Sequence, residues 1–572
     1  MSRIDWIILV LTLGATVMYG IYKSKTTRDL DGYFRGNREM PWYLVLLSIM
    51  GTQASAVTFL SAPGQAYTDG MRFVQYYFGL PLAMVVLCIT FVPIFRRLNL
   101  YTAYEFLEKR FDVRTRTLTS VLFMISRGLS TGISVYAPSI ILSSLMGWNI
   151  YWTNAFMGGL LIIYTVSGGA KAVAHTQKLQ LLIVFIGLFI AAYTCVSMLP
   201  EGIGFSEALH IGGKMGKMNV ISTGITEQGF DWTDRFNIFS GVIGGFFLAL
   251  SYFGTDQSQV GRFLTAKSDK ESKLGLLMNG VVKVPMQFLI LLIGILLFTF
   301  YQFNQSPLLF NTLPLDKARS HVVYGDSIRA LEQQHILLAE EKKIAVTELS
   351  GELKTKGNVD TAVKRLAYIN ARQEVLRREA RGLIKDAKVA GETNDTNYIF
   401  LRFVIDHLPR GLIGLLIAVI FLAAWGSIAA ALNSLASASV VDIHKKFIHK
   451  DLSEEQDYKL SKWYSLFWGL FCVATAMFVT GMGSLIEAVN VLGSWFYGII
   501  LGIFLVAFYI KSIGGKAVFW GAMISQILIL LIYWRSDLAW LWLNVIGAAL
   551  VIGISFVLNL FFMRSRTVLP VQ

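Results

Sequence analysis

An interrupted apolar segment contains the residues of this chain that are best suited to binding a ligand. Residues 42–62 read WYLVLLSIMGTQASAVTFLSA, and Pro63 and Gly64 follow directly. The apolar run is interrupted by small or polar residues, namely Gly51, Thr52, Gln53, Ser55 and Thr58. Backbone polar groups cannot stay unpaired in lipid, so a broken membrane helix must line a cavity walled by protein. Breaks of this kind hold solute and coupling ion in secondary transporters, and the segment therefore predicts a transport site.

Two basic residues inside apolar segments are further candidates for functional residues. Lys283 lies between the apolar residues 274–282 and a further apolar run, and Arg127 lies within another. A cation inside the membrane is costly and usually functional, although a lysine can also snorkel to the interface. A lysine that faces a cavity can donate hydrogen bonds to sugar hydroxyls or neutralise an anion. We expect Arg127 to pair with a polar group inside the bundle.

Composition indicates a polytopic membrane protein and excludes several other classes. The chain has 572 residues, of which 54% are hydrophobic and 15% are charged, and its net charge is +14. The basic residues lie in short loops between apolar spans, as the positive-inside rule requires, so nucleic-acid binding is a poor explanation of the charge. The cysteines Cys88, Cys195 and Cys472 all lie within apolar spans. Without a nucleophile–base set, a metal motif or a phosphate loop, the sequence does not favour an enzyme.

About thirteen apolar spans recur along the chain, and the loops between them predict the topology. The first span, residues 6–22, has no small-residue cleavage site and is interpreted as a retained helix. Residues 403–440 are expected to form a single long span. The loops richest in lysine and arginine follow odd-numbered spans, so they are predicted to be cytoplasmic, with the N-terminus outside and the C-terminus inside.

A polar insert, residues 302–398, follows an even-numbered span and is therefore expected outside. Positions that are mostly apolar recur in it at alternating three- and four-residue spacing, at Ile328, Leu331, His335, Leu338, Lys342, Ala345 and Leu349, and again at Ala362, Leu366, Ile369, Gln373, Leu376, Ala380 and Leu383. The turn residues 356–358 separate the two series, so the insert predicts an antiparallel helical hairpin. It is either an inert external feature or a docking site for a protein partner.

Two groups of five spans follow the first span, and an odd number places the groups in opposite orientations, as in an inverted repeat. The second group also opens on an apolar segment rich in glycine and polar residues, and we expect a second break there. Its interrupting residues are Gly241, Gly244, Gly245, Ser251, Tyr252 and Gly254.

Several motifs in a fixed order resemble the sodium:solute symporter family, which includes sodium-coupled sugar, iodide, proline and vitamin carriers. The matching segments are residues 31–34, 55–67, 101–111, 164–173, 254–267 and 427–443, and the likeness spans about residues 30–565 apart from the insert. It implies an all-α membrane protein with a leucine-transporter-type 5+5 inverted repeat. The expected parts are a leading helix (1–30), the first part of the bundle (31–301), the insert (302–398), the rest of the core (399–510) and two final helices (511–572).

The resemblance also implies a sodium site between the first and eighth core helices. Its ligands would be the carbonyl groups of Gly51, Ala54 and Ala423 and the hydroxyl of Ser427. The alternative role for Ser427 and its neighbour Gly426 is close helix packing. Many members have a second serine or threonine where this chain has Gly426. Many also have Trp-Thr-Asp at residues 175–177, which read His-Thr-Gln here, so a second sodium site that needs this carboxylate is doubtful. Proton coupling through His175 or a solvated histidine at a helix end are the alternatives there.

Positions that match solute-binding residues of sugar-carrying members are Thr58, Tyr77, Tyr252, Lys283 and Asn490, with Gln75 and Glu487 nearby, and Tyr252 would be an inner gate. Lys283 favours a sugar carrier. In contrast, Tyr77 replaces a glutamate of that branch, and residues 135–142 are closer to the iodide and vitamin branch. The solute therefore stays open between a sugar and an organic or inorganic anion, including a vitamin-like carboxylate.

Together these observations predict a sodium-coupled symporter that imports a small polar solute by alternating access. Sodium is the coupling ion, no other cofactor is expected, and the partners are the solute, the lipid bilayer and possible proteins at residues 302–398. We expect a multi-pass protein of the plasma membrane, the inner membrane in a bacterium. The alternatives are a membrane solute sensor and a proton-coupled transporter of the same fold.

Overall fold

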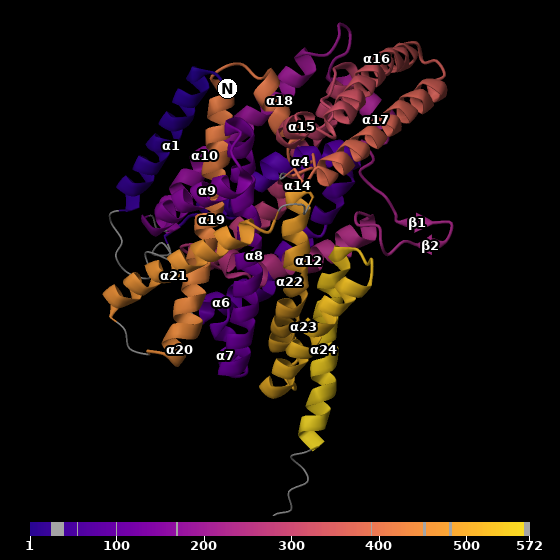
Figure 1. Ribbon diagram of the computed structural model, residues 1–572. Helices are drawn as coiled ribbons and strands as arrows, with labels where there is room; N and C mark the ends of the chain where they lie inside the picture. Colours follow the sequence, from indigo (N-terminus) through magenta and orange to yellow (C-terminus); the bar gives the residue numbers. More distant parts are fainter. Residues whose placement is uncertain are drawn as a thin grey trace, which may run out of the picture.

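Long apolar helices packed side by side form most of the computed structural model (Figure 1). The structure describes residues 1–24, 39–53, 55–98, 100–167, 170–389, 392–449, 453–479 and 483–564. Among these residues, eight helices are long and apolar enough to cross a membrane, and two shorter apolar helices accompany them. Bilayer thickness accounts for their length, since about 20 residues of helix span the hydrocarbon layer.

The helices up to residue 214 form the first part of the bundle, and α1, the first of them, packs against α10 and α19. The helices are α1 (Arg3–Ser24), α3 (Trp42–Gln53), α4 (Ala56–Asp69), η2 (Gly70–Tyr77), α5 (Leu80–Val86), η3 (Leu87–Phe91), α6 (Val92–Arg97), α7 (Glu105–Arg110), α8 (Val113–Met146), α9 (Ile150–Ser167), α10 (Ala170–Ser197) and α11 (Phe205–Lys214).

The second part comprises η4 (Ser240–Gly244), α12 (Gly245–Thr255), α13 (Gln257–Leu264), α14 (Asp269–Phe303), α18 (Ile399–His407), α19 (Leu412–Ala438), η5 (Ser439–His444), α20 (Lys445–Phe447), α21 (Glu454–Ala476), α22 (Leu485–Tyr509), α23 (Gly515–Arg535) and α24 (Trp540–Arg564). The expected single span over residues 403–440 is wrong. Pro409 follows the end of α18, and Gly411 has a φ of +91°, which favours glycine, so the chain turns before α19 begins.

The predicted break in the first core helix is confirmed. α3 ends at Gln53, α4 begins at Ala56, and Ser55 between them has an extended backbone. The carbonyl of Gln53 accepts hydrogen bonds from the Ser55 amide at 2.9 Å and from the Thr58 hydroxyl at 3.1 Å. α19 packs against both α3 and α4, so the break is enclosed by protein, as a lipid environment requires.

The second predicted break, at residues 241–245, is wrong. η4 is a π-helical turn that continues directly into α12, and Gly244 and Gly245 both have helical dihedral angles. The glycines serve close packing instead. A Cβ atom on Gly241 would lie 2.4 Å from the carbonyl oxygen of Gln75, and one on Gly245 would lie 2.3 Å from that of Tyr76. Small residues therefore let η4 and α12 approach η2 closely.

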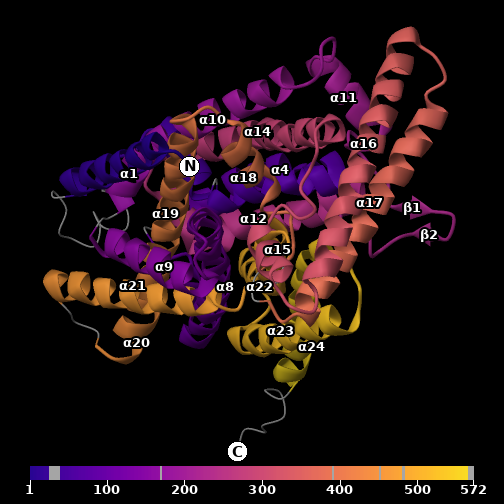
Figure 2. The ribbon, with the colours of Figure 1, turned by 45° about the horizontal axis from the view of Figure 1, so that its top comes forward.

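The predicted hairpin is confirmed. It consists of α16 (Gly325–Thr355) and α17 (Asp360–Asp386), which lie side by side and project from the bundle next to α15 (Thr312–Arg319) (Figures 1 and 2). Its turn begins at Lys356, whose φ is +56°. The buried stripe passes through Ala339 and Ile384, whereas the predicted Leu338 and Leu383 are only partly buried.

One small β-element departs from the all-helical expectation. β1 (Ile225–Thr226) and β2 (Gly229–Phe230) form a two-residue antiparallel pair in the segment that joins α11 to η4. Gly229 has a φ of +106°, in the left-handed region that favours glycine and suits a tight turn.

Candidate functional site

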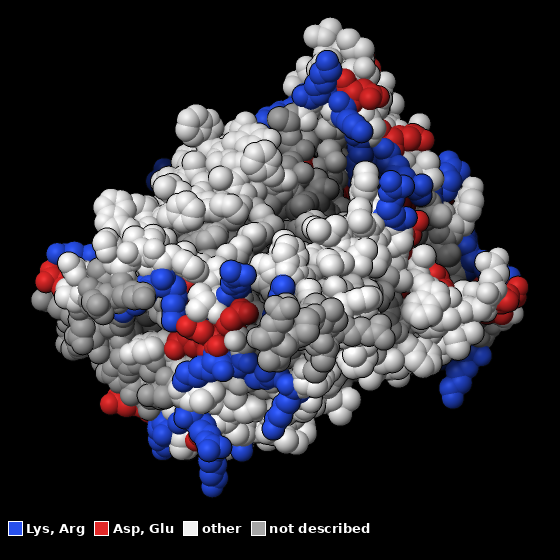
Figure 3. Space-filling model, turned by 90° about the horizontal axis from the view of Figure 1, so that it is seen from below, with Lys and Arg blue, Asp and Glu red and all other residues white. Residues whose placement is uncertain are grey.

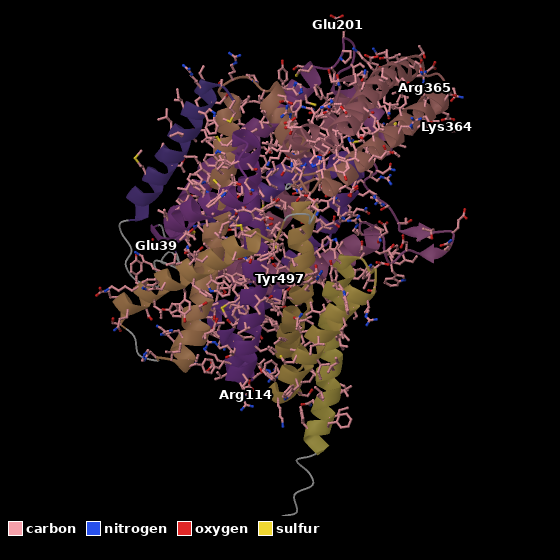
Figure 4. The ribbon with its side chains drawn as sticks, viewed as in Figure 1. Glu39, Arg114, Glu201, Lys364, Arg365 and Tyr497 are labelled. Carbon is pink, nitrogen blue, oxygen red and sulfur yellow. The ribbon has the colours of Figure 1, made fainter. Side chains whose placement is uncertain are left out.

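A cavity of about 130 Å³, called the central cavity below, lies beside the break between α3 and α4. Residues of the broken helix, η2, α5, α8, α12, α14 and α22 line it, and Figure 4 shows one of them, Tyr497, in the middle of the molecule. The lining residues are Gln53, Ser55, Val57, Thr58, Tyr76, Tyr77, Leu80, Arg127, Ser134, Gly245, Leu248, Ala249, Tyr252, Phe253, Lys283, Ile486, Val489, Asn490 and Tyr497.

Five of the seven predicted solute-binding residues come together in this cavity: Thr58, Tyr77, Tyr252, Lys283 and Asn490. The other two have different surroundings. Gln75 is buried and donates from Nε2 to the carbonyl of Phe236 at 3.0 Å. Glu487 accepts a hydrogen bond from Arg235 at 2.7 Å and lines two other pockets. The structure therefore places Gln75 and Glu487 outside the central cavity.

Lys283 is the cation of the cavity that lacks a counter-charge. Its side chain is buried, with 3% of the residue exposed, and Nζ lies 5.8 Å from the ring centroid of Tyr77. Within the described part of the chain, no carboxylate oxygen lies within ion-pair distance of this nitrogen. A buried amine without a partner is costly, and the cation–π contact with Tyr77 offsets only part of that cost.

Arg127, the second cation of the cavity, does have a counter-charge. One of its guanidinium nitrogens lies 3.7 Å from Asp256, which confirms the expected pairing with a polar group, and its Nε has no hydrogen-bond partner among the described residues. Asp256 also caps α13 by accepting from the Ser258 amide at 2.8 Å. The guanidinium lies 5.7 Å from the ring centroid of Tyr252, so Arg127 belongs to the cavity wall as well as to an ion pair.

Seven polar or aromatic lining residues were not predicted for the solute site: Gln53, Ser55, Tyr76, Arg127, Ser134, Phe253 and Tyr497. The sequence could have indicated Gln53 and Ser55 as site residues, because they are polar residues inside the break. It could also have indicated Arg127, because Arg127 is a cation inside the membrane. It could not have indicated Tyr76 and Tyr497, since an aromatic residue in an apolar helix is ordinary.

The described residues of the predicted sodium site are all buried. Gly51 lies in the last turn of α3, and Ala423 and Ser427 lie on α19, which packs against α3 and α4. Ser427 donates its hydroxyl hydrogen to the carbonyl of Ala424 at 2.9 Å, which leaves its oxygen lone pairs available to a cation. Ala54 lies outside the described residues.

Hydrogen bonds connect α4 and residue 397 to the start of α22, next to the central cavity. The hydroxyl groups of Ser61 and Ser484 lie 3.0 Å apart, and the amide of Ile486 donates to Ser61 at 3.3 Å. The side chain of Asn397 accepts from the Leu485 amide at 3.1 Å. Tyr252, the predicted inner gate, lies at another part of the wall. Its hydroxyl accepts a hydrogen bond from Nε2 of Gln259 in α13 at 2.7 Å.

Comparison with known proteins identifies the family and the fold. A model of the sodium:solute symporter family matches residues 33–336 and 377–525. The sodium/sialic acid symporter SiaT of Proteus mirabilis is 26% identical over 559 residues, which cover 96% of this chain and 93% of that protein. The human sodium/iodide cotransporter is 29% identical over 295 residues, which cover 52% of this chain and 44% of that protein.

A solved structure of a Na⁺-coupled sialic acid symporter in its substrate-bound outward-open state has a TM-score of 0.74 with this chain. The two are 24% identical, and the match covers 98% of each chain. This likeness confirms the predicted fold class, an all-α membrane protein with a leucine-transporter-type inverted repeat, whereas the number of spans stays a prediction.

The Arg127–Asp256 pair predicts a large loss of stability in Asp256→Ala. The substitution removes a helix cap and leaves a buried guanidinium uncompensated, so the free energy of unfolding should fall by about 3–5 kcal/mol. Asp112→Ala is the matched control, because Asp112 caps α8 by accepting from the Thr115 amide at 2.7 Å. Losing a cap alone costs about 0.5–2 kcal/mol. Thermal unfolding in detergent measures both, and equal losses would contradict the paired role of Asp256.

Proposed function

The chain belongs to the sodium:solute symporter family, and we propose that it uses a sodium gradient to import a small organic anion. The members and relatives reported above are transporters, not enzymes. The observation that carries the choice of an anion is Lys283, a buried cation of the central cavity without a carboxylate partner in the described part of the chain.

The balance of charge in the cavity supports an anion over a neutral sugar. Asp256 compensates Arg127, whereas Lys283 keeps an excess positive charge. A bound carboxylate would compensate that charge, while a neutral sugar would leave it unpaired in a site of low dielectric. Sialate and iodide, the solutes named for the two relatives, are both anions.

Sodium would act through the broken helix. The carbonyl groups of Gly51, Ala54 and Ala423 and the hydroxyl of Ser427 would bind one sodium ion between α3 and α19. A sodium ion in that place ties the two helices together and so favours the conformation that binds solute. The gradient of the ion is then transmitted as a difference in affinity between two conformations.

We infer that the hairpin lies outside the cell and the opposite end of the molecule lies in the cytoplasm. Arg114 lies at the lower end of the molecule in Figure 4, while Glu201, Lys364 and Arg365 lie at the other end. Figure 3 shows the molecule from below, with lysine and arginine side chains gathered around a smaller acidic group. The positive-inside rule makes this lower face cytoplasmic.

Lys283→Gln tests the solute class, because it keeps a hydrogen-bond donor and removes the charge. For an anion, uptake should be nearly abolished, since the carboxylate loses its partner. For a neutral sugar, affinity should fall only a few-fold. Lys270→Gln, at an exposed position of the same helix, is the control and should transport normally. Uptake of the best solute by vesicles that contain each variant measures the effect, and unchanged affinity in Lys283→Gln would remove the residue from the site.

Ser427→Ala tests the sodium site. Loss of one hydroxyl ligand should raise the sodium concentration for half-maximal uptake by roughly tenfold, equivalent to about 1.4 kcal/mol. Ser434→Ala is the control, because Ser434 also donates to a carbonyl of α19, that of Ala430 at 2.9 Å. Sodium titration of uptake distinguishes them. An identical sodium dependence in wild type and Ser427→Ala would leave Ser427 only a packing role.

A further inference from the structure

A second pocket, of about 640 Å³, lies between the hairpin and the bundle and is called the hairpin vestibule below. Its walls come from the ends of α4 and α14, from α16 and α17, from residues 394–396 and from the start of α22. The hairpin is therefore part of the wall of a pocket and not a separate appendage. Asn370 of α17 donates to Gln302 of α14 at 3.0 Å and helps to hold the hairpin against the bundle.

The vestibule and the central cavity are lined by neighbouring residues of the same helices. α4 contributes Thr58 to the central cavity and Gln65 to the vestibule, and α22 contributes Asn490 and Glu487 in the same way. Ser61 of α4 lies between Thr58 and Gln65 in sequence, and its hydroxyl lies 3.0 Å from that of Ser484, which lines the vestibule. Since the inferred topology places the hairpin outside, a solute that approaches the central cavity from outside would meet the vestibule first.

Most of the charges in the vestibule are compensated by neighbours. Arg235 contacts Glu487 at 2.7 Å, and Arg381 contacts Glu374 at 3.1 Å and Asp395 at 4.0 Å. Arg377 lies 3.7 Å from Glu374. These pairs give the vestibule little net charge of their own.

Two lysines are the exceptions within the described part of the chain. Lys342 donates from Nζ to the side-chain oxygen of Gln373 at 2.8 Å, and no carboxylate lies within ion-pair distance. Lys217 donates to the carbonyl of Thr68, and its Nζ lies 5.1 Å from the ring centroid of Phe298. Asp69 also lines the vestibule, attracts Lys217 electrostatically from beyond ion-pair distance and accepts a hydrogen bond from Gln65. Neutral oxygens therefore accept the printed hydrogen bonds of both amines, and neither amine has a carboxylate within ion-pair distance among the described residues.

A lysine is an unfavourable residue at position 342 if its only role is to hold the two helices of the hairpin together. It occupies the buried stripe between α16 and α17 and is 2% exposed, whereas an apolar residue there would avoid desolvating an amine. Burial and the nearby Arg377 lower the pKa of Lys342 to about 7. Its partner Gln373 has a buried Nε2 without a hydrogen-bond partner among the described residues. A polar pair is thus kept at a core position, at a cost in stability, where it lines the vestibule.

We propose that the hairpin vestibule is a second binding site for organic anions, in which Lys342 of the hairpin and Lys217 of the bundle attract a carboxylate next to the central cavity. That this anion is the transported solute rests on the proposed function. The hairpin then contributes directly to solute capture, because positive charge concentrated in a concave site raises the local concentration and the association rate of an anion.

The electrical potential of the vestibule can be measured without transport. A cysteine at Ala371, an exposed position that lines the vestibule, is reacted with an anionic and with a cationic methanethiosulfonate reagent in the full-length protein. Thr347→Cys, at an exposed position of α16 outside the vestibule, is the control. The native cysteines Cys88, Cys195 and Cys472 are buried, so their background is low. The rate of labelling by the anionic reagent, divided by the rate of labelling by the cationic reagent, should be roughly tenfold higher at residue 371 than at residue 347.

Substitutions of Lys342 connect this ratio to the proposed site. Lys342→Met should remove most of the difference between residues 371 and 347, and Lys342→Arg should keep it. Lys342→Met should also keep or raise the midpoint of thermal unfolding, since it no longer desolvates an amine. Equal ratios at the two cysteines would overturn the proposal. So would a Lys342→Met variant in which the ratio is unchanged although the midpoint of thermal unfolding is kept or raised.

Protection by ligand separates the vestibule from the central cavity. N-acetylneuraminate, lactate, biotin and iodide are each added before the reagent, in wild-type and Lys283→Gln backgrounds that carry the cysteine at residue 371. At least one of the organic anions should slow labelling equally in both backgrounds. Absence of protection by every anion, or protection that disappears with Lys283→Gln, would overturn the proposal. Uptake of a neutral sugar and of no anion would instead overturn the proposed function, while the labelling ratio would still decide the charge of the vestibule.

Discussion

The requirement that backbone polar groups stay paired inside a membrane determines how this molecule is built around its site. The break between α3 and α4 frees backbone groups that lipid cannot satisfy, so protein must enclose them. α19 packs against both halves of the broken helix and has small residues such as Ala423 and Gly426 in the region predicted to bind sodium. The same break borders the central cavity, so the groups that need partners lie where a cation and a solute can supply them.

A second constraint is the free-energy cost of buried charge, and the charges along the proposed solute pathway differ in whether a neighbour compensates them. Arg127 is compensated by Asp256 in the central cavity, and the arginines of the vestibule are compensated by glutamate and aspartate. Lys283 and Lys342 lack such partners among the described residues and lie in two neighbouring pockets, the central cavity and the vestibule. An anion that moved from one pocket to the other would therefore meet an uncompensated lysine in each.

Features set by strong local patterns could be predicted from the sequence, and features set by packing could not. Polar residues inside an apolar run located the first break, and the spacing of Ile328 to Leu349 located a helix of the hairpin. Glycine serves both breaks and close packing, so Gly241–Gly245 predicted a break where the helix continues. Gln75 and Tyr77 are two residues apart on the helical segment η2, so their side chains do not share a face, and Gln75 donates to the carbonyl of Phe236 instead of lining the cavity.

The most direct test of the account is uptake by vesicles that contain the purified protein, with and without an inward sodium gradient. The labelled solutes are N-acetylneuraminate, lactate and biotin as anions and glucose as the neutral comparison. The account predicts that at least one anion accumulates above equilibrium, that it does so only with the sodium gradient, and that glucose does not. Accumulation of glucose alone, or equal anion uptake without the gradient, would contradict it.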